Sequence, residues 1–252
     1  MSSNSIDELN NYNFTDLVYI ICPTYNRRKF LKNLINIFSD QIYPRHLLYL
    51  LILDDSDTTN QDIINNLDID LKCRIIYIYD QHKKTIGHKR NILNNLAKDL
   101  CAQYIVCFDD DDYYPPYKVA YAVYNLKQSN YLICGSSILP IYYSHLKEIY
   151  IYGPFFNKIN YGHATNGTLV YNVKYLKNNS YDNNDTFGEE KKFLNNFKVQ
   201  LLQLDYMYVI LCIAHTNNTI DKNTLIQSGV LINYNLDFFI KNSKVLNFYI
   251  QL

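Results

Sequence analysis

Four consecutive aspartates, Asp109–Asp112, are the residues in this sequence best suited to do chemistry. They follow a short segment, residues 104–108, that is rich in β-branched and aromatic side chains, as a buried strand should be. Four neighbouring carboxylates repel one another at neutral pH unless cations offset their charge. Because open α/β sheets bind ligands at the carboxyl ends of their strands, the run predicts a metal site.

Other structures compete with the metal site. An acidic run beside Pro115 and Pro116 is often only a solvated turn, and the run alone does not exclude that alternative. An EF-hand calcium loop fails on spacing. Counted from Asp109, the sixth residue is Tyr114 where glycine is needed, and the twelfth is Ala120 where glutamate is needed.

The elements around the run alternate in type. Apolar runs predict strands, and apolar residues at helical spacing predict helices between them. The predicted strands are 17–22, 47–53, 74–79 and 104–108, and the predicted helices are 30–38, 62–67 and 88–100. Such alternation predicts a parallel sheet with right-handed crossovers. Residues 23–26, 54–57 and 109–112 all follow strands, so they should meet at one edge of the sheet.

The second half is less regular. Strands are predicted at 131–136, 149–152 and 206–213, a turn and strand within 162–170, and a helix at 189–197. The fold class is therefore α/β, a Rossmann-like, mainly parallel sheet flanked by helices with a smaller mixed region. Residues 1–15 are expected to be a loose tail, residues 16–220 one domain, and residues 221–252 an extension packed on it.

Composition narrows the class of protein. The 252 residues carry 24 Lys+Arg and 24 Asp+Glu, which argues against a general nucleic-acid-binding protein but leaves a local basic patch open. The six cysteines form no CxxC pair and sit mostly in apolar runs, as reduced, buried thiols do. No secretory signal and no apolar run of roughly 20 residues is visible, so a soluble, cytoplasmic protein is expected.

Familiar nucleotide and hydrolase motifs are missing. The seven glycines form neither GxGxxG after the first strand nor a GxxxxGK[ST] phosphate loop, and no GxSxG occurs. An α/β sheet with acidic loops remains, and it suits a diphosphate ligand bridged by a divalent cation.

Seven segments, in order and spacing, resemble the family 2 glycosyltransferases with the GT-A fold, over about Val18 to His215. The matching segments are residues 21–27, 52–57, 87–91, 108–116, 166–171, 188–194 and 215–219. The resemblance implies a nucleotide-binding half over residues 16–116 and an acceptor half over residues 117–220. Acceptor choice would lie in the irregular region of about 135–190.

The resemblance implies roles for residues on the donor side. Thr24 and Tyr25 would border the nucleobase, and Asp55 would accept a hydrogen bond from the uracil ring N–H. Arg90, or Lys89 beside it, would approach the uridine or the diphosphate. The alternatives are structural: the Asp54–Asp57 segment could cap the next helix, and Lys89 could be an ordinary solvated helix charge.

In the acidic run the family pattern is Asp-x-Asp. It puts Asp109 or Asp110 near the ribose and Asp111 on a Mn²⁺ or Mg²⁺ ion, with Asp109 as a second candidate ligand. Because all four positions are aspartate, the register stays open, and Asp112 could be only a helix cap. His215 resembles a histidine that some members use as a further metal or diphosphate ligand, although a histidine after a strand is often simply hydrogen-bonded.

Glu190 matches the general base that takes the proton from the acceptor hydroxyl, with Glu189 as a rival for that role. The alternative is two acidic side chains at the positive end of a helix dipole. The function implied is a metal-dependent, inverting transfer of sugar from a UDP-sugar to a hydroxyl of a carbohydrate or of a protein- or lipid-linked glycan.

Two other functions stay open at this stage. One is a nucleotide-sugar-binding protein of the same fold without turnover. The other is a metal-dependent nucleotidyltransferase, which is disfavoured because the loop after the first strand, residues 23–28, lacks glycine. No nucleic-acid partner and no transmembrane segment are expected, and assembly into homo-oligomers is left open.

Overall fold

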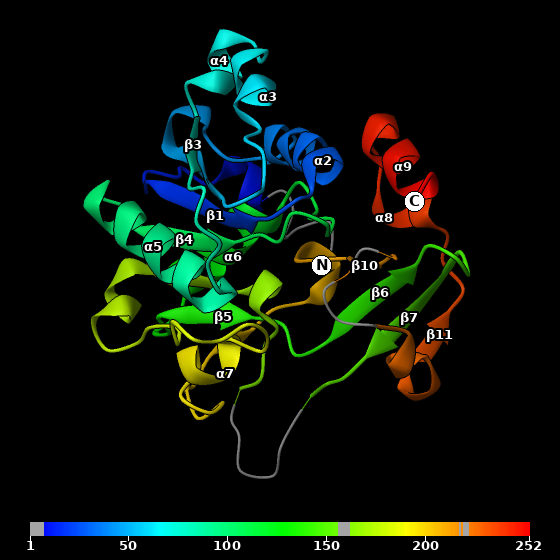
Figure 1. Cartoon of the computed structure of the whole chain (residues 1–252). Coiled ribbons are helices and arrows are strands. Elements are labelled where there is room, and N and C mark those ends of the chain that lie inside the picture. The colour runs from blue at the N-terminus through cyan, green and yellow to red at the C-terminus, as the bar shows by residue number, and fades with distance from the viewer. Residues whose placement is uncertain (1–7, 156–161, 217, 219–221) are drawn as a thin grey trace.

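The computed structural model describes residues 8–155, 162–216, 218 and 222–252. Two sheets and a set of helices make up this part of the chain (Figure 1). The strands of the larger sheet are β1 (Val18–Thr24), β2 (Leu48–Asp54), β3 (Ile75–Tyr79), β4 (Tyr104–Cys107), β5 (Ile133–Gly135), β8 (Val170–Asn172) and β9 (Leu202–Gln203). The helices are α2 (Arg28–Ser39), α3 (Gln61–Asn65), α4 (Ile69–Lys72), α5 (Ile86–Asp99), α6 (Lys118–Lys127), α7 (Glu190–Phe193), α8 (Leu236–Phe239) and α9 (Ser243–Ile250).

The larger sheet has the order β3-β2-β1-β4-β8-β5-β9, and its first four strands are parallel. In register, Ile20 of β1 lies between Leu50 of β2 and Val106 of β4. β8 runs antiparallel to both β4 and β5. This arrangement confirms the predicted α/β class with a mainly parallel sheet.

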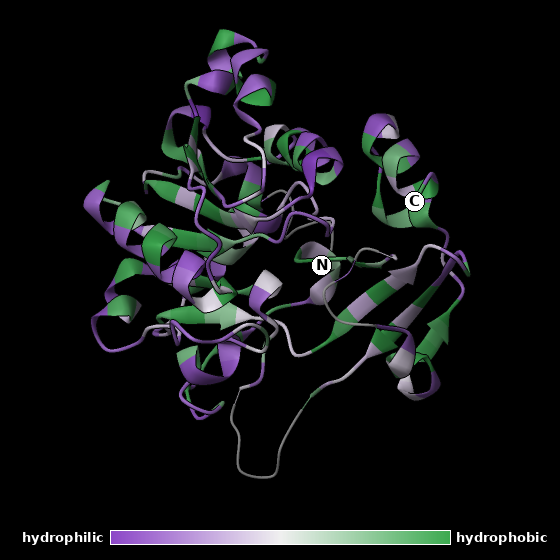
Figure 2. Cartoon of the chain, in the orientation of Figure 1, coloured by the Kyte–Doolittle hydropathy of each residue, from purple (hydrophilic) through white to green (hydrophobic). Residues whose placement is uncertain are grey.

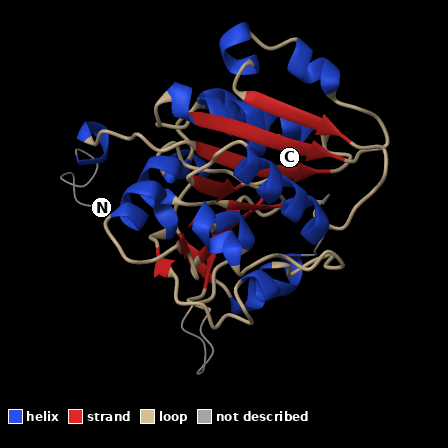
Figure 3. Cartoon of the chain, turned by 90° about the vertical axis from the view of Figure 1, so that its left-hand side faces the viewer, coloured by secondary structure: helices blue, strands red, loops and turns tan. Residues whose placement is uncertain are grey.

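Helices cover both faces of this sheet, as the turned view shows (Figure 3). Residues of β1 alternate between the two faces, as the strand period of two requires. Val18 and Ile20 pack with α2 and α6, whereas Tyr19 and Ile21 pack with α5 and α7. The hydropathy view agrees, because apolar colour fills the strands and purple dominates the outer turns of the helices (Figure 2).

The smaller sheet joins β6 (Leu139–Tyr143), β7 (Glu148–Tyr152), β10 (Cys212–Ala214) and β11 (Val230–Ile232). Its order is β10-β6-β7-β11, with one parallel and two antiparallel pairings. It is the mixed region that the sequence predicted. Among the described helices, none combines the length and the apolar character that a membrane crossing needs.

Three predicted elements are wrong in extent. The strand predicted within 162–170 begins only at Val170 and runs to Asn172. The strand predicted at 206–213 is confined to Cys212–Ala214, because the Asp205 side chain accepts from the Met207 N–H and starts a 3₁₀ turn. The helix predicted at 189–197 ends at Phe193, and the residues Asn195, Asn196 and Phe197 have positive φ.

The described residues near both ends of the chain contribute to the core, although residues 1–15 were expected to be a loose tail. Leu9 and Phe14 fall in the segment expected to be loose, yet both are buried in the larger core; residues 1–7 lie outside the described residues. Within residues 222–252, Val245 and Tyr249 of α9 are fully buried, whereas Val230 and Leu231 of β11 are exposed. All six cysteines are free thiols, and Cys73 and Cys101 are exposed rather than buried.

Candidate active site

The acidic run directly follows β4 and lines a cavity of about 380 Å³. Asp109, Asp110 and Asp111 share that cavity with the Glu189–Glu190 pair. The convergence predicted from strand order is therefore present: the loops after β1 and β4 meet, and α7 closes the cavity from the second half of the chain. Each carboxylate has different partners, and these partners distinguish their roles.

Arg27, in the loop between β1 and α2, holds two of the aspartates. Its Nη1 donates to Asp110 Oδ1 (2.8 Å) and to Asp111 Oδ2 (2.6 Å), while the Thr24 hydroxyl donates to Asp110 Oδ2 (2.5 Å). Burial raises the pKa of Asp110 to about 6, although Arg27 opposes the shift. The guanidinium thus supplies the positive charge that this part of the run needs.

Asp111 also faces the smaller sheet. His215 Nε2 lies 3.2 Å from Asp111 Oδ2, and the Asn218 amide donates to the same oxygen (3.1 Å). Burial favours the neutral acid, but the hydrogen bond from His215 and the charge of Arg27 hold the pKa of Asp111 below its usual range. Phe30 of α2 stacks on the imidazole at 4.5 Å between ring centroids, which fixes its orientation. Residues 217 and 219 of the 215–219 segment lie outside the described residues.

Arg90 of α5 is the second buried cation. Its Nη2 donates to Asp109 Oδ1 (2.6 Å) and its Nε to Glu189 Oε1 (2.8 Å). Burial opposes the charge, but Asp109 and Glu189 raise the pKa of Arg90 well above its usual value. With the amide turned over, the Asn166 oxygen also accepts from this guanidinium at 2.8–2.9 Å. Glu189 is therefore tied to a cation.

Glu190 differs from every other carboxylate of the cavity. It lies in the first turn of α7, is partly exposed and lines the cavity, and no other residue in the described part of the chain forms a hydrogen bond or ion pair with its side chain, which accepts only from its own backbone N–H. Burial, with the negative charge of Glu189, raises the pKa of Glu190 to about 7. A carboxylate with this pKa can accept a proton near neutral pH.

Asp55 lies deeper than the predicted nucleobase contact would suggest. Its side chain is fully buried, and its oxygens accept from Lys89 Nζ (2.7 Å) and from the Lys84 N–H (2.7 Å). Tyr25 and Thr24 line an adjoining cavity of about 320 Å³, together with Lys89. Lys89 is thus a buried ion-pair partner rather than a solvated helix charge.

The neighbouring aspartates of that loop do not cap a helix. Asp54 accepts from the Ser56 N–H (2.9 Å), the Asn60 amide (2.7 Å) and the Tyr77 hydroxyl (2.6 Å), and so fixes the loop itself. Helix α3 begins at Gln61 without a side-chain cap, so the capping alternative for residues 54–57 is wrong.

Asp112 holds the two sheets together. It accepts from the Ile213 N–H (2.9 Å) and the Cys212 thiol (3.2 Å) of β10, and its backbone carbonyl accepts from the Tyr249 hydroxyl (2.8 Å). It caps no helix, because α6 begins six residues later with Tyr117 at its N-cap. Burial raises the pKa of Asp112 to about 6.

The donor set next to Asp111 fits a small divalent cation in type. A carboxylate oxygen and an imidazole nitrogen lie 3.2 Å apart, and Mn²⁺ accepts both kinds of ligand. Within the described residues, however, no group of three or more His, Cys, Asp or Glu side chains is arranged to hold a metal ion. The Arg27 guanidinium bridges Asp110 and Asp111 instead.

Two residues of this region escaped the sequence analysis. Arg27 was part of a matching segment but carried no assigned role. Lys118 is fully buried, and its ammonium donates to the carbonyl oxygens of Cys107 (2.8 Å) and Gly167, which joins the end of β4 to the 3₁₀ turn Asn166–Thr168. A lysine two residues after paired prolines gives no sequence signal of burial.

The fold and site can be compared with known proteins. The family model described as glycosyl transferase family 2 matches residues 19–182, more than half of the chain. This chain belongs to glycosyl transferase family 2. The family resemblance predicted from the seven segments is thereby confirmed.

Solved structures share the fold. A complex of S. aureus TarS residues 1–349 with UDP-GlcNAc superposes with a TM-score of 0.53 at 16% identity, over 80% of this chain and 60% of that chain. The mannosyltransferase PcManGT from Pyrobaculum calidifontis, in complex with GDP-Man and Mn²⁺, gives a TM-score of 0.57 at 13% identity, over 89% of this chain and 66% of that chain. The predicted GT-A fold class of this family 2 member is confirmed.

This family 2 chain is shorter than those proteins. It spans 60% of the TarS 1–349 chain and 36% of the longer TarS chain, to which it is 16% identical with a TM-score of 0.51. A search of curated proteins found no match. At these identities the likeness shows the fold alone.

Proposed function

We propose that this glycosyltransferase moves a sugar from a UDP-sugar to an acceptor hydroxyl with inversion, assisted by Mn²⁺ or Mg²⁺. The observation that carries the proposal is the position of Glu190. It is a partly exposed carboxylate without a protein partner among the described residues, and it faces the same cavity as the acidic run. A carboxylate that only started a helix would have no reason to line that cavity.

Glu190 is the general base in this proposal. Its carboxylate takes the proton from the acceptor hydroxyl while that oxygen attacks the anomeric carbon and the nucleoside diphosphate leaves from the opposite side. Glu189 acts differently, because its bond to Arg90 holds a cation beside Asp109. A nucleotide-sugar-binding protein without turnover would not need an unpaired carboxylate at this position.

Cations lining the cavity support a diphosphate ligand. Arg27, Arg90 and Lys222 line it, and each is at present within 4 Å of a carboxylate of the acidic run. The solved relatives hold UDP-GlcNAc or GDP-Man, so both bases need testing. Asp55 is proposed as the acceptor for the base N–H; each of its oxygens already accepts one hydrogen bond, from Lys89 Nζ or the Lys84 N–H, and has a lone pair for a second.

A divalent cation would be held by Asp111, with His215 and Asp109 as further ligands. When bound, it supplies positive charge that stabilises the departing diphosphate. Arg27 then has to release Asp110 and Asp111, and its freed guanidinium is positioned to pair with the diphosphate oxygens. The PcManGT complex with Mn²⁺ supports the use of a divalent cation in this fold.

Calorimetric titration tests the donor and the metal together. UDP and GDP are each titrated with Mn²⁺ and with chelator, followed by UDP-sugars and GDP-mannose in a hydrolysis assay. The proposal expects UDP to bind only with Mn²⁺ and GDP to bind at least about tenfold more weakly, a difference of about 1.4 kcal/mol. Equal UDP affinity with and without chelator contradicts the metal role, and preference for GDP contradicts the UDP-sugar donor.

A further inference from the structure

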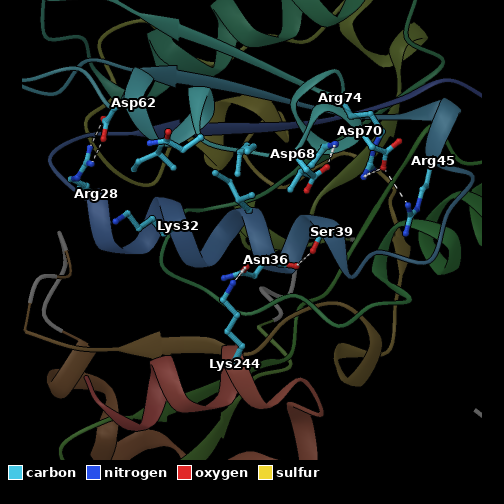
Figure 4. Close-up of a pocket in the computed structure, with 15 residues that line it drawn as sticks. Arg28, Lys32, Asn36, Ser39, Arg45, Asp62, Asp68, Asp70, Arg74 and Lys244 are labelled. Carbon is cyan, nitrogen blue, oxygen red and sulfur yellow. Dashed lines mark hydrogen bonds and ion pairs between the residues drawn. The ribbon is translucent and has the colours of Figure 1, made fainter.

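Two further cavities lie along α2, on the side away from the acidic run. The larger, about 670 Å³, is shown in Figure 4, and it shares no lining residue with the donor cavity. Most of its cations are neutralised: Arg28 pairs with Asp62, and Arg45 pairs with Asp70. In the same view Lys32, on α2, has no dashed line to any partner. The charges of this cavity therefore mostly satisfy one another.

The adjoining groove between α2 and α9, about 630 Å³, has a different lining. Four cations line it, Arg28, Lys29, Lys32 and Lys244, and none of its lining residues, all within the described ranges, is acidic. The remaining lining consists of amide side chains and Phe248. Arg28 is paired with Asp62, so the local excess of positive charge comes from Lys29, Lys32 and Lys244; in a chain with equal numbers of acidic and basic residues it is not a consequence of composition.

Helix α2 carries Arg28, Lys29 and Lys32, and its own dipole makes this excess of positive charge less favourable. The first turn of α2 contains no acidic residue and its N-cap side chain makes no capping bond, so its free N–H groups add to the positive charge of Arg28 and Lys29. Cations at the positive end of a helix dipole are unfavourable. Neither Lys29 nor Lys32 forms an ion pair within the described residues. An anion in the groove would relieve both effects.

A buried amide points to the same conclusion. Asn33, on α2, lines the groove and is 2% exposed, and neither its Oδ1 nor its Nδ2 makes a hydrogen bond of good geometry among the described residues. Burial raises the pKa of the Tyr249 hydroxyl, and the Asn33 side chain is close enough to oppose that rise through a hydrogen bond, while the hydroxyl donates to the Asp112 carbonyl. Because a side-chain amide carries two N–H donors, one remains for an anion in the groove.

We propose that the α2–α9 groove is a second anion site, which binds a phosphate-bearing ligand. Lysine ammonium groups and amide N–H donors together suit phosphate oxygens. The site is separate from the donor cavity. Phe30 stands between them, because its ring stacks on His215 and also contacts Phe248 of the groove wall edge-on, at 5.5 Å between centroids. The proposal does not depend on the donor or the metal proposed above.

The test uses inorganic tripolyphosphate as the probe, titrated into the full chain in the presence of chelator. Lys32→Glu reverses the unpaired cation, and Lys177→Glu, on the exposed side of the 3₁₀ turn Val173–Lys177, makes the same change of net charge elsewhere. We expect Lys32→Glu to weaken tripolyphosphate binding at least about tenfold and Lys177→Glu less than about twofold. UDP binding with Mn²⁺ should be unchanged in both variants, which also shows that they fold.

Four outcomes overturn the proposal. Equal losses in the two variants mean non-specific charge attraction, and no loss in Lys32→Glu places the anion elsewhere. Competitive displacement of tripolyphosphate by UDP, measured separately with excess Mn²⁺ so that UDP can bind, means that the probe occupies the donor cavity. The natural ligand could carry its phosphate on a small molecule or within a polymer. Titration of a sugar monophosphate tests the first source, and titration of a glycerophosphodiester oligomer tests the second. RNA that binds far more tightly than either, and depends on Lys32, would replace the proposal with a nucleic-acid site.

Discussion

Two charged regions lie on either side of the first turn of α2, and they are built in opposite ways. In the donor cavity, Asp109, Asp110 and Asp111 each accept from a buried or half-buried arginine. In the α2–α9 groove, Lys29 and Lys32 face no carboxylate among the lining residues. The cavity has its charges paired by the protein itself, so a ligand must exchange with existing ion pairs. The groove has charges that only a ligand can pair.

Glu190 is the exception inside the donor cavity, and its removal should have the largest effect. Glu190→Gln should lower kcat by about 10²–10⁴-fold, the usual share of a general base, with nucleotide affinity nearly unchanged. The substitution keeps the shape of the side chain but removes its basicity. Single-turnover rates with saturating donor measure the loss.

Glu189→Gln is the matched control for this prediction. Because Glu189 is bonded to Arg90, its substitution should weaken donor binding more than it lowers kcat. A larger kcat loss in Glu189→Gln would make Glu189 the base. Full activity in both variants would mean that the two glutamates only begin helix α7 and take no part in catalysis.

Asp111→Asn should remove the metal dependence of UDP binding, with a loss of Mn²⁺ affinity of about 100-fold, the upper end for disturbing a metal site. Repulsion within the acidic run alone predicts a more stable apo protein. The structure predicts the reverse, because Arg27 loses one of its two carboxylate partners and His215 loses its charged partner. The melting temperature in chelator should fall, at about 2–4 °C per kcal/mol. A rise would show that repulsion among the carboxylates outweighs these contacts.

Arg27→Gln should raise Mn²⁺ affinity in the absence of nucleotide by about tenfold, because the internal cation no longer competes for Asp110 and Asp111. The same variant should bind UDP more weakly in the presence of Mn²⁺. Arg28→Gln is the control, since the Arg28 and Asp62 side chains are 48% and 55% exposed and such pairs contribute about 1 kcal/mol or less. Equal metal affinity in both variants would mean that Arg27 does not compete with the metal ion for Asp110 and Asp111.

The pH dependence should be the smallest effect. Because Glu190 acts unprotonated and has a pKa of about 7, kcat should rise about tenfold from pH 6 to pH 8 and then level off. Glu190→Gln should flatten this profile. An unchanged profile in the variant would assign the titration to another group.

The same group affects stability in the opposite direction. Its pKa rises from 4.5 to about 7 on folding, so the folded protein holds the proton more tightly than the unfolded chain. The resulting stabilisation is complete below about pH 4.5 and is lost as the pH rises to about 7. Denaturant titrations of wild type and Glu190→Gln across this range should converge at low pH and diverge above it. Parallel curves would contradict the shift.

Much of the fold was predictable because the first four strands are apolar runs that end at polar loops. That pattern placed residues 23–26, 54–57 and 109–112 at one sheet edge, and the structure brings them together through Thr24 with Asp110 and Asn26 with Ser56. Helix α6 was not predicted, because it is buried on nearly every side and so lacks the polar face that makes helical periodicity visible.

The side-chain pairing within the site was not predictable in the same way. Periodicity gives the face of an element on which a residue lies, but not the direction of a long side chain across a loop. The contacts of Arg27 with two aspartates, and of Lys89 with Asp55, depend on such directions. The acidic pair at 189–190 was recognised by resemblance, whereas its division into a paired and an unpaired carboxylate needed the structure.

The Tyr249 hydroxyl, at the end of α9, donates to the backbone carbonyl of Asp112, 137 residues earlier in the sequence. A contact of this span forms only after nearly all the intervening chain has been synthesised and folded. The β1–β4 sheet can form on the ribosome well before that, with Asp112 still lacking its contacts to β10 and α9. Competence to bind the donor should therefore be acquired late in biogenesis, in one step when residues 243–250 dock.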